Sequence, residues 1–597
     1  MSNVKVTDFI ASYLSEHYGV DTVFMVTGGG AMHLNDSFGR HPRMKVIFNH
    51  HEQACAIAAE GYVRSSGKIC VVNITTGPGG LNTLTGVLGQ WTDSVPVLYI
   101  SGQVRFDTTI ASCPDLGLRQ LGDQEVDITR VVSPIVKYAS IVRDPTNIRR
   151  EIDRAIAAAV NGRPGPAWID VPMNVQGARV DPDTLKGFDG KAPKSVPINE
   201  AKLNEILGGA ERPVIIAGHG IRLAKAIESL RYLLDEVAIP VVTTFNGYDL
   251  IESAHPNFVG RVGTIGDRAG NFAVQNSDLL LCIGTRNNIR QVGYNYQSFA
   301  RAAVKVVVDI DPAELEKTTL LPDMKVATDA GDFLKVLIAS CSRMPRDRWS
   351  EWLHWCRQRK ERYPVVLQEY RDSSDLNPYL FIEELTKRLK AEDLIVAGNG
   401  TACVALFQAG IVKKGQRSFW NSGCAAMGYD LPAAIGAAVA NPGRMVVCLA
   451  GDGSLQLNLQ ELATLVGNNL EVKLFVLNNG GYISIKQTQM NFFGKPLIGC
   501  DKSSGLFFPR LSSLAQAYDL RYFSITRDNI ADLDEVLRAP GPCICEVMLP
   551  PDYRFSPKSS SEKKPDGRIV SKPLEDLAPF LEREEFMSNM IIAPLDE

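Results

Sequence analysis

The segment Gly451–Tyr482, GDGSLQLNLQELATLVGNNLEVKLFVLNNGGY, most constrains what this chain can fold into. Its Gly-Asp-Gly-Ser turn follows the apolar run Met445–Ala450, and Asn478-Asn479 near its end follow the apolar run Val472–Leu477. Two short apolar runs joined by a helix-length segment predict a strand, a helix and a second, parallel strand. Because open α/β sheets bind ligands at the carboxyl ends of their strands, we expect Asp452 and Asn479 to lie together at one such edge.

The oxygen atoms of this segment suit a divalent cation. Mg²⁺ prefers carboxylate, amide and carbonyl oxygens, with phosphate and water completing its octahedron. Asp452, Asn479 and the backbone carbonyl of Gly481 supply these three kinds of oxygen. We therefore predict a magnesium–diphosphate anchor with these three ligands. An ordinary βαβ unit with Gly and Asn in its turns is the alternative that the segment alone leaves open.

The GDG and NN pair resembles the motif of thiamine diphosphate enzymes, and motifs nearer the N-terminus resemble the acetolactate synthase and pyruvate oxidase-like group of that family. His51-Glu52-Gln53 opens an Ala-rich segment that ends in Glu60-Gly61-Tyr62. The further matching motifs are Thr76-Gly77-Pro78-Gly79-Gly80-Leu81-Asn82, Asp93-Ser94-Val95-Pro96, Ser101-Gly102-Gln103-Val104 and Gln124-Glu125-Val126-Asp127. Together with the third domain, the resemblance covers nearly all of residues 1–550.

The resemblance implies a catalytic carboxylate at Glu52. A glutamate that opens a helix can simply be favoured by the helix dipole, which is the ordinary explanation. The family needs a buried carboxylate that protonates the aminopyrimidine ring of thiamine, and burial raises a carboxyl pKa into the range where a proton can be shared. Gln124 is assigned with Glu52 to the catalytic set. In the family, the first domain of one subunit meets the third domain of another at the active site, so a homodimer or homotetramer is implied.

The third domain contains two further segments that resemble cofactor-binding elements of the family. Glycine turns let backbone N–H groups bind phosphate. The resemblance implies diphosphate contacts from Gly400, Thr401, Gly453 and Ser454. The segment Gly423–Tyr429 resembles the one whose methionine wedges beneath the cofactor, which implies that role for Met427. The carbonyl of Ala425 is then expected to accept a hydrogen bond from the 4′-amino group.

Three stretches alternate short apolar runs with helical patterns, which indicates an α/β fold with three doubly wound parallel-sheet domains. We expect an N-terminal pyrimidine-binding domain at 1–180, a central domain at 198–345, a diphosphate-binding domain at 375–550 and a C-terminal tail at 551–597, with a polar linker at 181–197. The expected strands are Thr22–Val26, Lys45–Phe48, Ile69–Asn73, Val95–Ser101, Ala167–Val171, Val214–Ala217, Pro240–Thr244, Leu279–Ile283, Lys305–Asp309, Leu394–Ala397, Met445–Ala450, Val472–Leu477 and Cys543–Met548. In the tail we expect the polar run SPKSSSEKKPDGR to be mobile and the stretch PLEDLAPFLEREEF to dock.

The central domain resembles the FAD-binding domain of the acetolactate synthases. Gly218-His219-Gly220 is only a fragment of a dinucleotide fingerprint, because Leu223 stands where the third glycine belongs. Strand-end Gly, Arg and Asp suit a pyrophosphate, an adenine edge and ribose hydroxyls. The residues assigned to FAD are Gly218, Gly220, Thr244, Gly263, Thr264, Arg286, Asp309 and Asp311. The implied FAD has a structural role, and bound ADP or an empty domain is the alternative.

Composition excludes several other classes. The 597 residues are too many for one core, and the net charge of −4 indicates no nucleic-acid partner. No apolar run reaches membrane-spanning length, and the N-terminus has no signal-peptide core. The 12 cysteines show no zinc-ligand spacing, so we expect reduced thiols in a cytoplasmic enzyme.

Thiamine supplies the chemistry, and the protein selects donor and acceptor. Pyruvate is the usual donor of the group. Thr488 stands where branched-chain acetolactate synthases have a tryptophan, and Asp123 stands where they have a phenylalanine, so the acceptor side is open and polar. With Gly29, these residues are assigned to the substrate side. We expect a pyruvate-decarboxylating carboligase acting on a bulky ketone such as a nucleotide-linked ketosugar, as in the carboligases of branched-chain sugar biosynthesis. The alternatives are acetolactate synthase, joining two pyruvates, and a non-catalytic thiamine-fold subunit.

Overall fold

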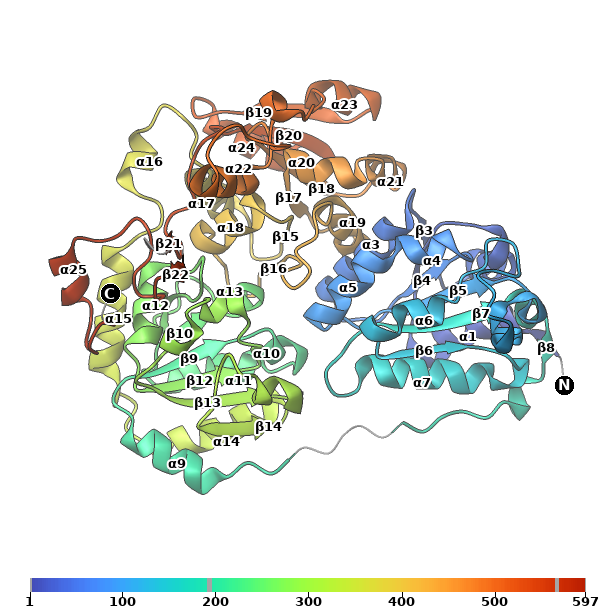
Figure 1. Ribbon diagram of the computed structural model, residues 1–597, viewed down its shortest axis with the longest axis horizontal. Helices are drawn as coiled ribbons and strands as arrows, with labels where there is room; N and C mark the ends of the chain where they lie inside the picture. The colour runs from blue at the N-terminus through green and yellow to red at the C-terminus, as the bar shows by residue number, and fades with distance from the viewer. Residues whose placement is uncertain (1–2, 191–195, 564–567, 596–597) are drawn as a thin grey trace.

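The computed structural model describes residues 3–190, 196–563 and 568–595, so part of the expected linker, 191–195, lies outside the described residues. Three six-stranded sheets form the framework, and every strand pair within them is parallel (Figure 1). Helices pack against the faces of each sheet. The predicted α/β fold class with three doubly wound parallel sheets is confirmed.

The first and third sheets share one topology. The first contains β2 (Thr22–Met25), β3 (Lys45–Phe48), β4 (Val71–Ile74), β5 (Leu98–Gln103), β6 (Tyr138–Ile141) and β7 (Ala167–Pro172), in the order β3-β2-β4-β5-β7-β6. The third contains β15 (Leu394–Ala397), β16 (Arg417–Phe419), β17 (Val446–Gly451), β18 (Val472–Asn478), β19 (Arg521–Ile525) and β20 (Cys543–Met548), in the order β16-β15-β17-β18-β20-β19. The same exchange of neighbouring strands occurs at both ends of each sheet. The two sheets are therefore structural relatives, although their sequences do not reveal it.

The central sheet has a different order. It contains β9 (Pro213–Ala217), β10 (Val241–Thr243), β11 (Phe258–Arg261), β12 (Leu279–Ile283), β13 (Val304–Asp309) and β14 (Met324–Ala327), arranged β11-β10-β9-β12-β13-β14. In chain order this is 3-2-1-4-5-6, the order of dinucleotide-binding sheets, in which the crevice lies between the first and fourth strands. The crevice of this sheet is therefore at the carboxyl ends of β9 and β12.

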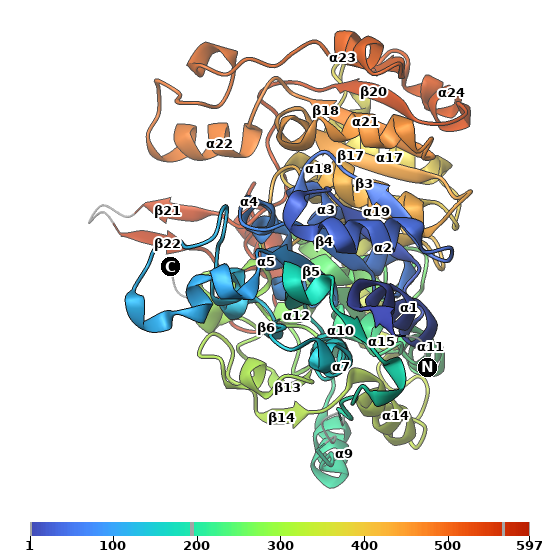
Figure 2. The ribbon, with the colours of Figure 1, turned by 90° about the vertical axis from the view of Figure 1, so that its right-hand side faces the viewer.

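Two helices that approach closely at glycine residues join the first and third sheets. In Figure 2, α3 (Glu52–Ser66) and α19 (Asp430–Ala440) lie against each other between the two sheets. A Cβ added at Gly436 would lie 1.8 Å from the Ala58 carbonyl oxygen, and one at Gly61 would lie 2.1 Å from that of Ala433. Glycine at both positions lets the two backbones touch, so the sheets form one continuous buried core within the chain.

A buried ionic cluster accompanies this helix crossing. Arg64 donates to Glu60 at 2.8 Å and to Asp93 at 2.7 Å, and the Tyr429 hydroxyl donates to Glu60 at 3.1 Å. Burial raises the pKa of Glu60 to about 7, against the lowering effect of Arg64. The cluster satisfies charges that would otherwise be isolated in a dry interface.

The tail lies along the central and third domains (Figure 1). Its docking stretch is fixed by Glu575, which accepts from Arg301 at 2.7 Å, and by Arg268, which donates to the Leu577 carbonyl at 3.1 Å. Helix α25 (Arg583–Ser588) follows. The prediction that this stretch docks is confirmed. In the polar run, β21 (Ser561–Lys563) pairs with β22 (Ile569–Ser571), which follows the run, and 564–567 lie outside the described residues. The expected mobility of this run stays a prediction.

Candidate functional site

The carboxyl ends of β17 and β18 carry Asp452 and Asn479 on adjacent parallel strands. Asp452 opens the short helix α20 (Asp452–Leu455) and accepts hydrogen bonds from the backbone N–H groups of Gly453 at 2.7 Å and Gly481 at 2.9 Å. Burial raises the pKa of Asp452 to about 6, and the backbone N–H groups oppose that shift. The structure thus brings together the carboxylate, the amide and the Gly481 turn at one sheet edge.

Two features of this edge fit a bound cation and diphosphate. The Asn479 side-chain oxygen is buried and has no hydrogen-bond partner among the described residues, which leaves it available as a ligand. The glycines keep the edge narrow: a Cβ at Gly453 would lie 2.0 Å from the Tyr482 ring, and one at Gly481, which has φ +148°, would lie 2.1 Å from the Cys500 carbonyl oxygen. One carboxylate, one amide oxygen and one carbonyl form the hard oxygen set that Mg²⁺ prefers.

The turn before α18 (Thr401–Ala409) faces the same edge of the sheet. Gly400 has φ +84°, a left-handed conformation that side chains rarely adopt, and it leaves the first N–H groups of α18 without intrahelical partners. The Thr401 hydroxyl hydrogen-bonds the Tyr553 hydroxyl. Asn399 donates to the Ala426 carbonyl at 2.7 Å while its own side-chain oxygen is buried without a partner among the described residues. These groups could bind a diphosphate.

The hydroxyl group of Ser454 is not free to donate a hydrogen bond to a diphosphate. Its hydroxyl accepts from the Gly428 N–H at 2.9 Å and donates to Asp430 at 2.5 Å. Burial raises the pKa of Asp430 to about 6. Because the hydroxyl proton is engaged, only the Ser454 backbone remains free for the role that the sequence assigns to this residue.

The segment that contains Ala425 and Met427 is held by Asn421 of the same domain. Asn421 accepts from the N–H groups of Cys424 at 3.2 Å and Ala425 at 3.0 Å, and Ala425 has φ +55°. A non-glycine residue in this conformation indicates a locally strained turn of the kind found at ligand sites. Met427 is partly exposed beside it, as a wedge beneath a cofactor requires.

Glu52 and its neighbours lie at the carboxyl edge of the first sheet. Glu52 begins α3 directly after the β3 segment, is partly exposed, and accepts from Asn82 at 3.0 Å. Gly29 lies in the 3-10 turn after β2, and the Gln124 carbonyl lies against Gly77, where a Cβ would approach it to 2.0 Å. Within the described part of the chain, Glu52 forms no hydrogen bond or ion pair with the third domain. The structure therefore places the predicted catalytic carboxylate in the first domain and the predicted metal anchor in the third domain.

The two residues assigned to the acceptor side, Thr488 and Asp123, also lie in different domains. Thr488 lies on an exposed face of α22 (Ile483–Phe492), where its hydroxyl donates to the Ser484 carbonyl at 3.0 Å, and Asp123 is exposed in the first domain. Large apolar side chains on and after α22 are exposed as well: Ile485, Met490, Phe492, Phe493, Ile498 and Phe507. An apolar surface of this kind beside a candidate site indicates a contact face.

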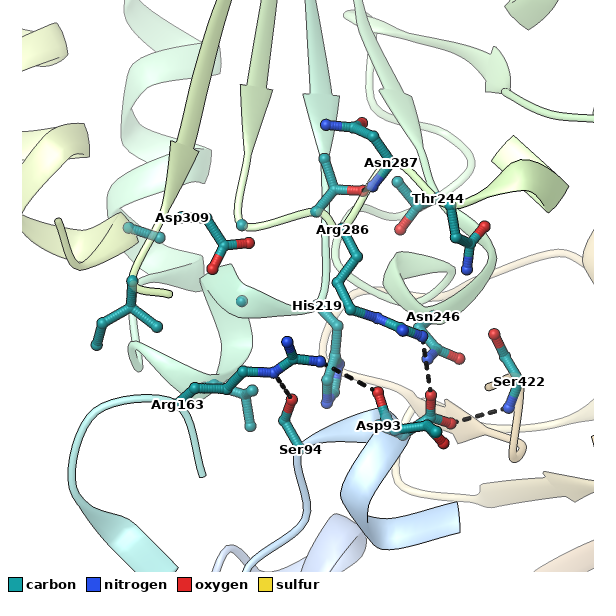
Figure 3. A pocket seen from close by; sticks show the side chains of 18 of the residues that line it. Asp93, Ser94, Arg163, His219, Thr244, Asn246, Arg286, Asn287, Asp309 and Ser422 are labelled. Atoms are coloured by element: carbon teal, nitrogen blue, oxygen red, sulfur yellow. Dashed lines mark hydrogen bonds and ion pairs between the residues drawn. The ribbon is translucent and has the colours of Figure 1, made fainter. Parts of the chain in front are cut away.

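A cavity of about 360 Å³ opens at the crevice of the central sheet. Figure 3 shows Arg163, Arg286 and Asp309 around the same space. Of the eight residues assigned to FAD, four line the cavity: Gly220, Thr244, Arg286 and Asp309. Burial raises the pKa of Asp309 to about 6. The cavity combines three arginines (Arg163, Arg286 and Arg290), a strand-end carboxylate and a glycine turn.

The other four assigned residues do not line this cavity, and each has a different contact. A Cβ at Gly218 would lie 2.2 Å from the Gly284 carbonyl oxygen, so this glycine allows two turns to touch. Gly263 and Thr264 pack on the turn that contains Arg290, whose carbonyl accepts from the Thr264 N–H at 2.8 Å. Asp311 is paired with Arg163 at 3.1 Å.

The sequence alone did not assign Arg163 and Asp93 to this site, two of the residues from the first domain that line the cavity. Arg163 donates to the Ser94 hydroxyl at 3.0 Å, and Asp93 lies 3.6 Å from Arg286 while accepting from the Ser422 N–H at 2.8 Å (Figure 3). Asp93 stands in a motif that resembles the family, which was the available signal. No sequence pattern marks Arg163, because its contact depends on how the domains pack.

Comparison with known proteins assigns each of the three sheets. Residues 4–129 match the thiamine pyrophosphate enzyme, N-terminal TPP binding domain; residues 201–337 match the central domain, and residues 398–547 match the C-terminal TPP binding domain. The chain belongs to the thiamine pyrophosphate enzyme family. Its members bind thiamine pyrophosphate, also called thiamine diphosphate, so the recognition made from the motifs is confirmed at the level of the family.

Relatives named acetolactate synthase align along most of the chain. The large subunit from Cyanidium caldarium is 31% identical over 568 residues, covering 92% of this chain and 94% of the relative. Acetolactate synthase 1 of Zea mays is 33% identical over 568 residues, covering 92% and 85%, and the isozyme 1 large subunit of Escherichia coli is 30% identical over 555 residues, covering 92% and 95%. Among the described residues, no helix has the length and apolarity needed to cross a membrane.

Proposed function

We propose that this thiamine-dependent enzyme decarboxylates pyruvate and joins the two-carbon unit to a second pyruvate, the acetolactate synthase reaction. The observation that carries the proposal is the edge formed by Asp452, Asn479 and Gly481, with its unpartnered buried amide oxygen. The names of the aligned relatives support this alternative better than the ketosugar carboligase expected from the sequence.

In this proposal, the residues of the third domain bind the cofactor and the residues of the first domain carry out the proton transfer. Thiamine diphosphate, when bound, supplies the electron sink for decarboxylation. Asp452, Asn479 and the Gly481 carbonyl would hold Mg²⁺, and the N–H groups that follow Gly400 would bind the diphosphate. Met427 would support the cofactor from below, with the Ala425 carbonyl accepting from its amino group. Glu52 would hold and release the proton at the pyrimidine ring, and Gln124 would lie beside it.

We propose that the two halves meet across a subunit interface in a homodimer or homotetramer. The partial exposure of Glu52 and the exposed apolar side chains of α22 support this arrangement. Mixing two inactive variants, Glu52→Gln and Asp452→Asn, provides the test. If each site uses both subunits, a mixed dimer regains one intact site, and the mixture recovers about a quarter of the wild-type activity. A mixture that exchanges subunits and stays inactive would contradict shared sites.

We propose that the central cavity binds FAD in a structural role. The 3-2-1-4-5-6 strand order, Arg163, Arg286 and Asp309 support a ligand with a pyrophosphate and ribose. The absorption spectrum of the purified protein tests this proposal. Release of one flavin per chain on denaturation is expected, whereas release of ADP or of no nucleotide would contradict FAD.

We also propose domain boundaries at 1–180, 198–345 and 375–550, and a cytoplasmic location for a chain whose 12 cysteines are all free thiols.

The exposed Thr488 on α22 favours a second candidate, a bulkier ketone acceptor. Products formed from pyruvate with thiamine diphosphate and Mg²⁺ can be identified by mass spectrometry, with and without a nucleotide-linked 4-ketosugar. Acetolactate from pyruvate alone supports the main proposal. A two-carbon adduct on the sugar, with no acetolactate, would support the second candidate instead. No carbon dioxide release in either mixture would reject pyruvate as the donor.

A further inference from the structure

Asp93, the last residue of α5 (Leu84–Asp93), lies where the three domains meet. Its buried carboxylate lines the central cavity and is 3.6 Å from the Arg286 guanidinium of the central domain. The same carboxylate accepts from two backbone N–H groups of the third domain, those of Ser422 at 2.8 Å and Gly423 at 3.1 Å (Figure 3). One side chain of the first domain therefore contacts both the cavity and the third domain.

Helix stability does not explain the position of this carboxylate. It stands at the carboxyl end of α5, where the partial negative charge of the helix end disfavours an anion. The next residue, Ser94, has φ +61°, a conformation that is uncommon outside glycine. Arg64 donates to the buried carboxylate at 2.7 Å and offsets part of the cost of burying its charge. A charge held against these local preferences indicates a role outside the helix.

The two N–H groups that donate to Asp93 begin the segment that contains the proposed cofactor contacts. Gly423 lets the segment lie against the end of α5, because a Cβ there would be 2.8 Å from the Asp93 carboxylate. Ala425, with φ +55°, and Met427 follow in the same segment. Asp93 therefore fixes the start of this segment relative to the first domain.

The cavity side of Asp93 is held by two arginines. Arg163 donates to the Ser94 hydroxyl at 3.0 Å and to the Thr92 carbonyl at 3.4 Å, so it holds the residues on both sides of Asp93. The 3.6 Å separation between Arg286 and Asp93 is longer than a hydrogen bond, which leaves the guanidinium free to turn toward a ligand. An anionic ligand that binds both arginines would immobilise the backbone around Asp93.

We propose that Asp93 is a positioning residue that holds the Ser422–Met427 segment in place for thiamine diphosphate and couples this segment to the ligand of the central cavity. This inference rests on the proposed function. Because coupling between two binding sites is reciprocal, each ligand tightens the binding of the other.

The first test is a calorimetric titration of thiamine diphosphate, at saturating Mg²⁺, into full-length protein depleted of nucleotide and thiamine diphosphate. Asp93→Asn has one side-chain oxygen instead of two, so either orientation leaves the Ser422 or the Gly423 N–H without its acceptor. We expect binding to weaken at least about fivefold, because a smaller fraction of the protein holds the segment in the binding conformation.

Asp153→Asn is the matched control. Asp153 is also a buried carboxylate of the first domain, and it accepts from the Tyr13 hydroxyl at 2.8 Å and the Tyr18 hydroxyl at 2.6 Å, both in that domain. Its variant should bind thiamine diphosphate within about twofold of the wild type, whatever its effect on the melting temperature. Equal weakening in both variants, or none in Asp93→Asn, would overturn the proposal.

The second test repeats the titration at saturating FAD. In the wild type, FAD should tighten thiamine diphosphate binding at least about threefold, and in Asp93→Asn less than about 1.5-fold. Arg286→Gln, at a partly exposed position where folding is at little risk, should lose the coupling in the same way while its affinity without FAD stays within about twofold. No coupling in the wild type, or full coupling in either variant, would overturn the inference.

Failure of the proposed function gives different results. A wild-type protein that binds no thiamine diphosphate would contradict the proposed function itself. A wild-type protein that binds thiamine diphosphate but no flavin would contradict only the FAD proposal and the coupling. The comparison of Asp93→Asn with Asp153→Asn would then still decide whether Asp93 positions the segment.

Discussion

Replacing Gly481 by alanine should disrupt the metal edge. Gly481 has φ +148°, and the added Cβ would lie 2.1 Å from the Cys500 carbonyl oxygen, where ordinary contact begins at 3.4 Å. The two backbones would have to move apart by about 1 Å. That movement pulls the Gly481 N–H from Asp452, now at 2.9 Å, and breaks the Tyr482 to Cys500 backbone hydrogen bond of 2.8 Å.

The expected magnitude follows from these losses. Backbone strain costs about 1–2 kcal/mol, and a hydrogen bond to a charged group contributes about 1.5–3 kcal/mol. Together they predict at least about 60-fold weaker Mg²⁺ binding in the presence of thiamine diphosphate, because 1.4 kcal/mol corresponds to about tenfold. Displacement of the Gly481 carbonyl, a proposed ligand, adds to the loss.

Gly480→Ala is the matched control. Gly480 has φ +73°, so alanine meets a similar backbone strain, but nothing lies within 4 Å of its added Cβ. We expect Gly480→Ala to weaken Mg²⁺ binding by about tenfold or less. Isothermal titration of Mg²⁺ into protein with saturating thiamine diphosphate compares the two. Equal affinities in the two variants would refute the assignment of the Gly481 turn to the metal site.

Three further predictions concern other parts of the chain. Glu52→Gln should abolish carbon dioxide release from pyruvate while leaving Mg²⁺ affinity within about twofold, since Glu52 lies outside the metal edge; retained turnover would contradict its role. Glu60 has a pKa raised to about 7 by burial, so the folded protein binds its proton more tightly than the unfolded chain. Unfolding free energy should therefore fall by about 3 kcal/mol as pH rises from about 4.5 to about 7, and urea unfolding of Glu60→Gln should lack this fall. Gly436→Val places atoms within 1.8 Å of the Ala58 carbonyl oxygen and should lower the melting temperature of the protein by several degrees or prevent folding; an unchanged melting curve would contradict the close crossing of α3 and α19.

The sequence predicts the interior strands of each sheet better than the edges. All interior strands were expected, with limits within about three residues of those observed. The five unpredicted strands of the large sheets, β6, β11, β14, β16 and β19, all lie at sheet edges. Interior strands of parallel sheets are buried on both faces and read as continuous apolar runs, whereas edge strands such as Arg521–Ile525 carry charged and polar residues.

The site was predictable where its residues come from one motif and unpredictable where packing brings distant segments together. Asp452, Asn479 and Gly481 belong to one strand–helix–strand unit, so their meeting follows from local topology. Tyr553 and Arg163 reach their positions from other parts of the chain, and neither has a neighbouring pattern that signals a ligand. The Ser454 hydroxyl shows a third case, because only the structure reveals that Asp430 already takes its proton.

The central claim is that Glu52 and the Asp452 edge form one site that activates thiamine diphosphate, and proton exchange at C2 of the bound cofactor tests it most directly. The holoenzyme is placed in deuterated buffer, quenched in acid at short times and examined by proton NMR. The wild type should exchange at least about 100-fold faster than the free cofactor, as general acid–base catalysis allows, and Glu52→Gln should return the rate close to that of free thiamine diphosphate. Equal exchange rates in the wild type and Glu52→Gln would contradict the assembly of these two halves into one active site.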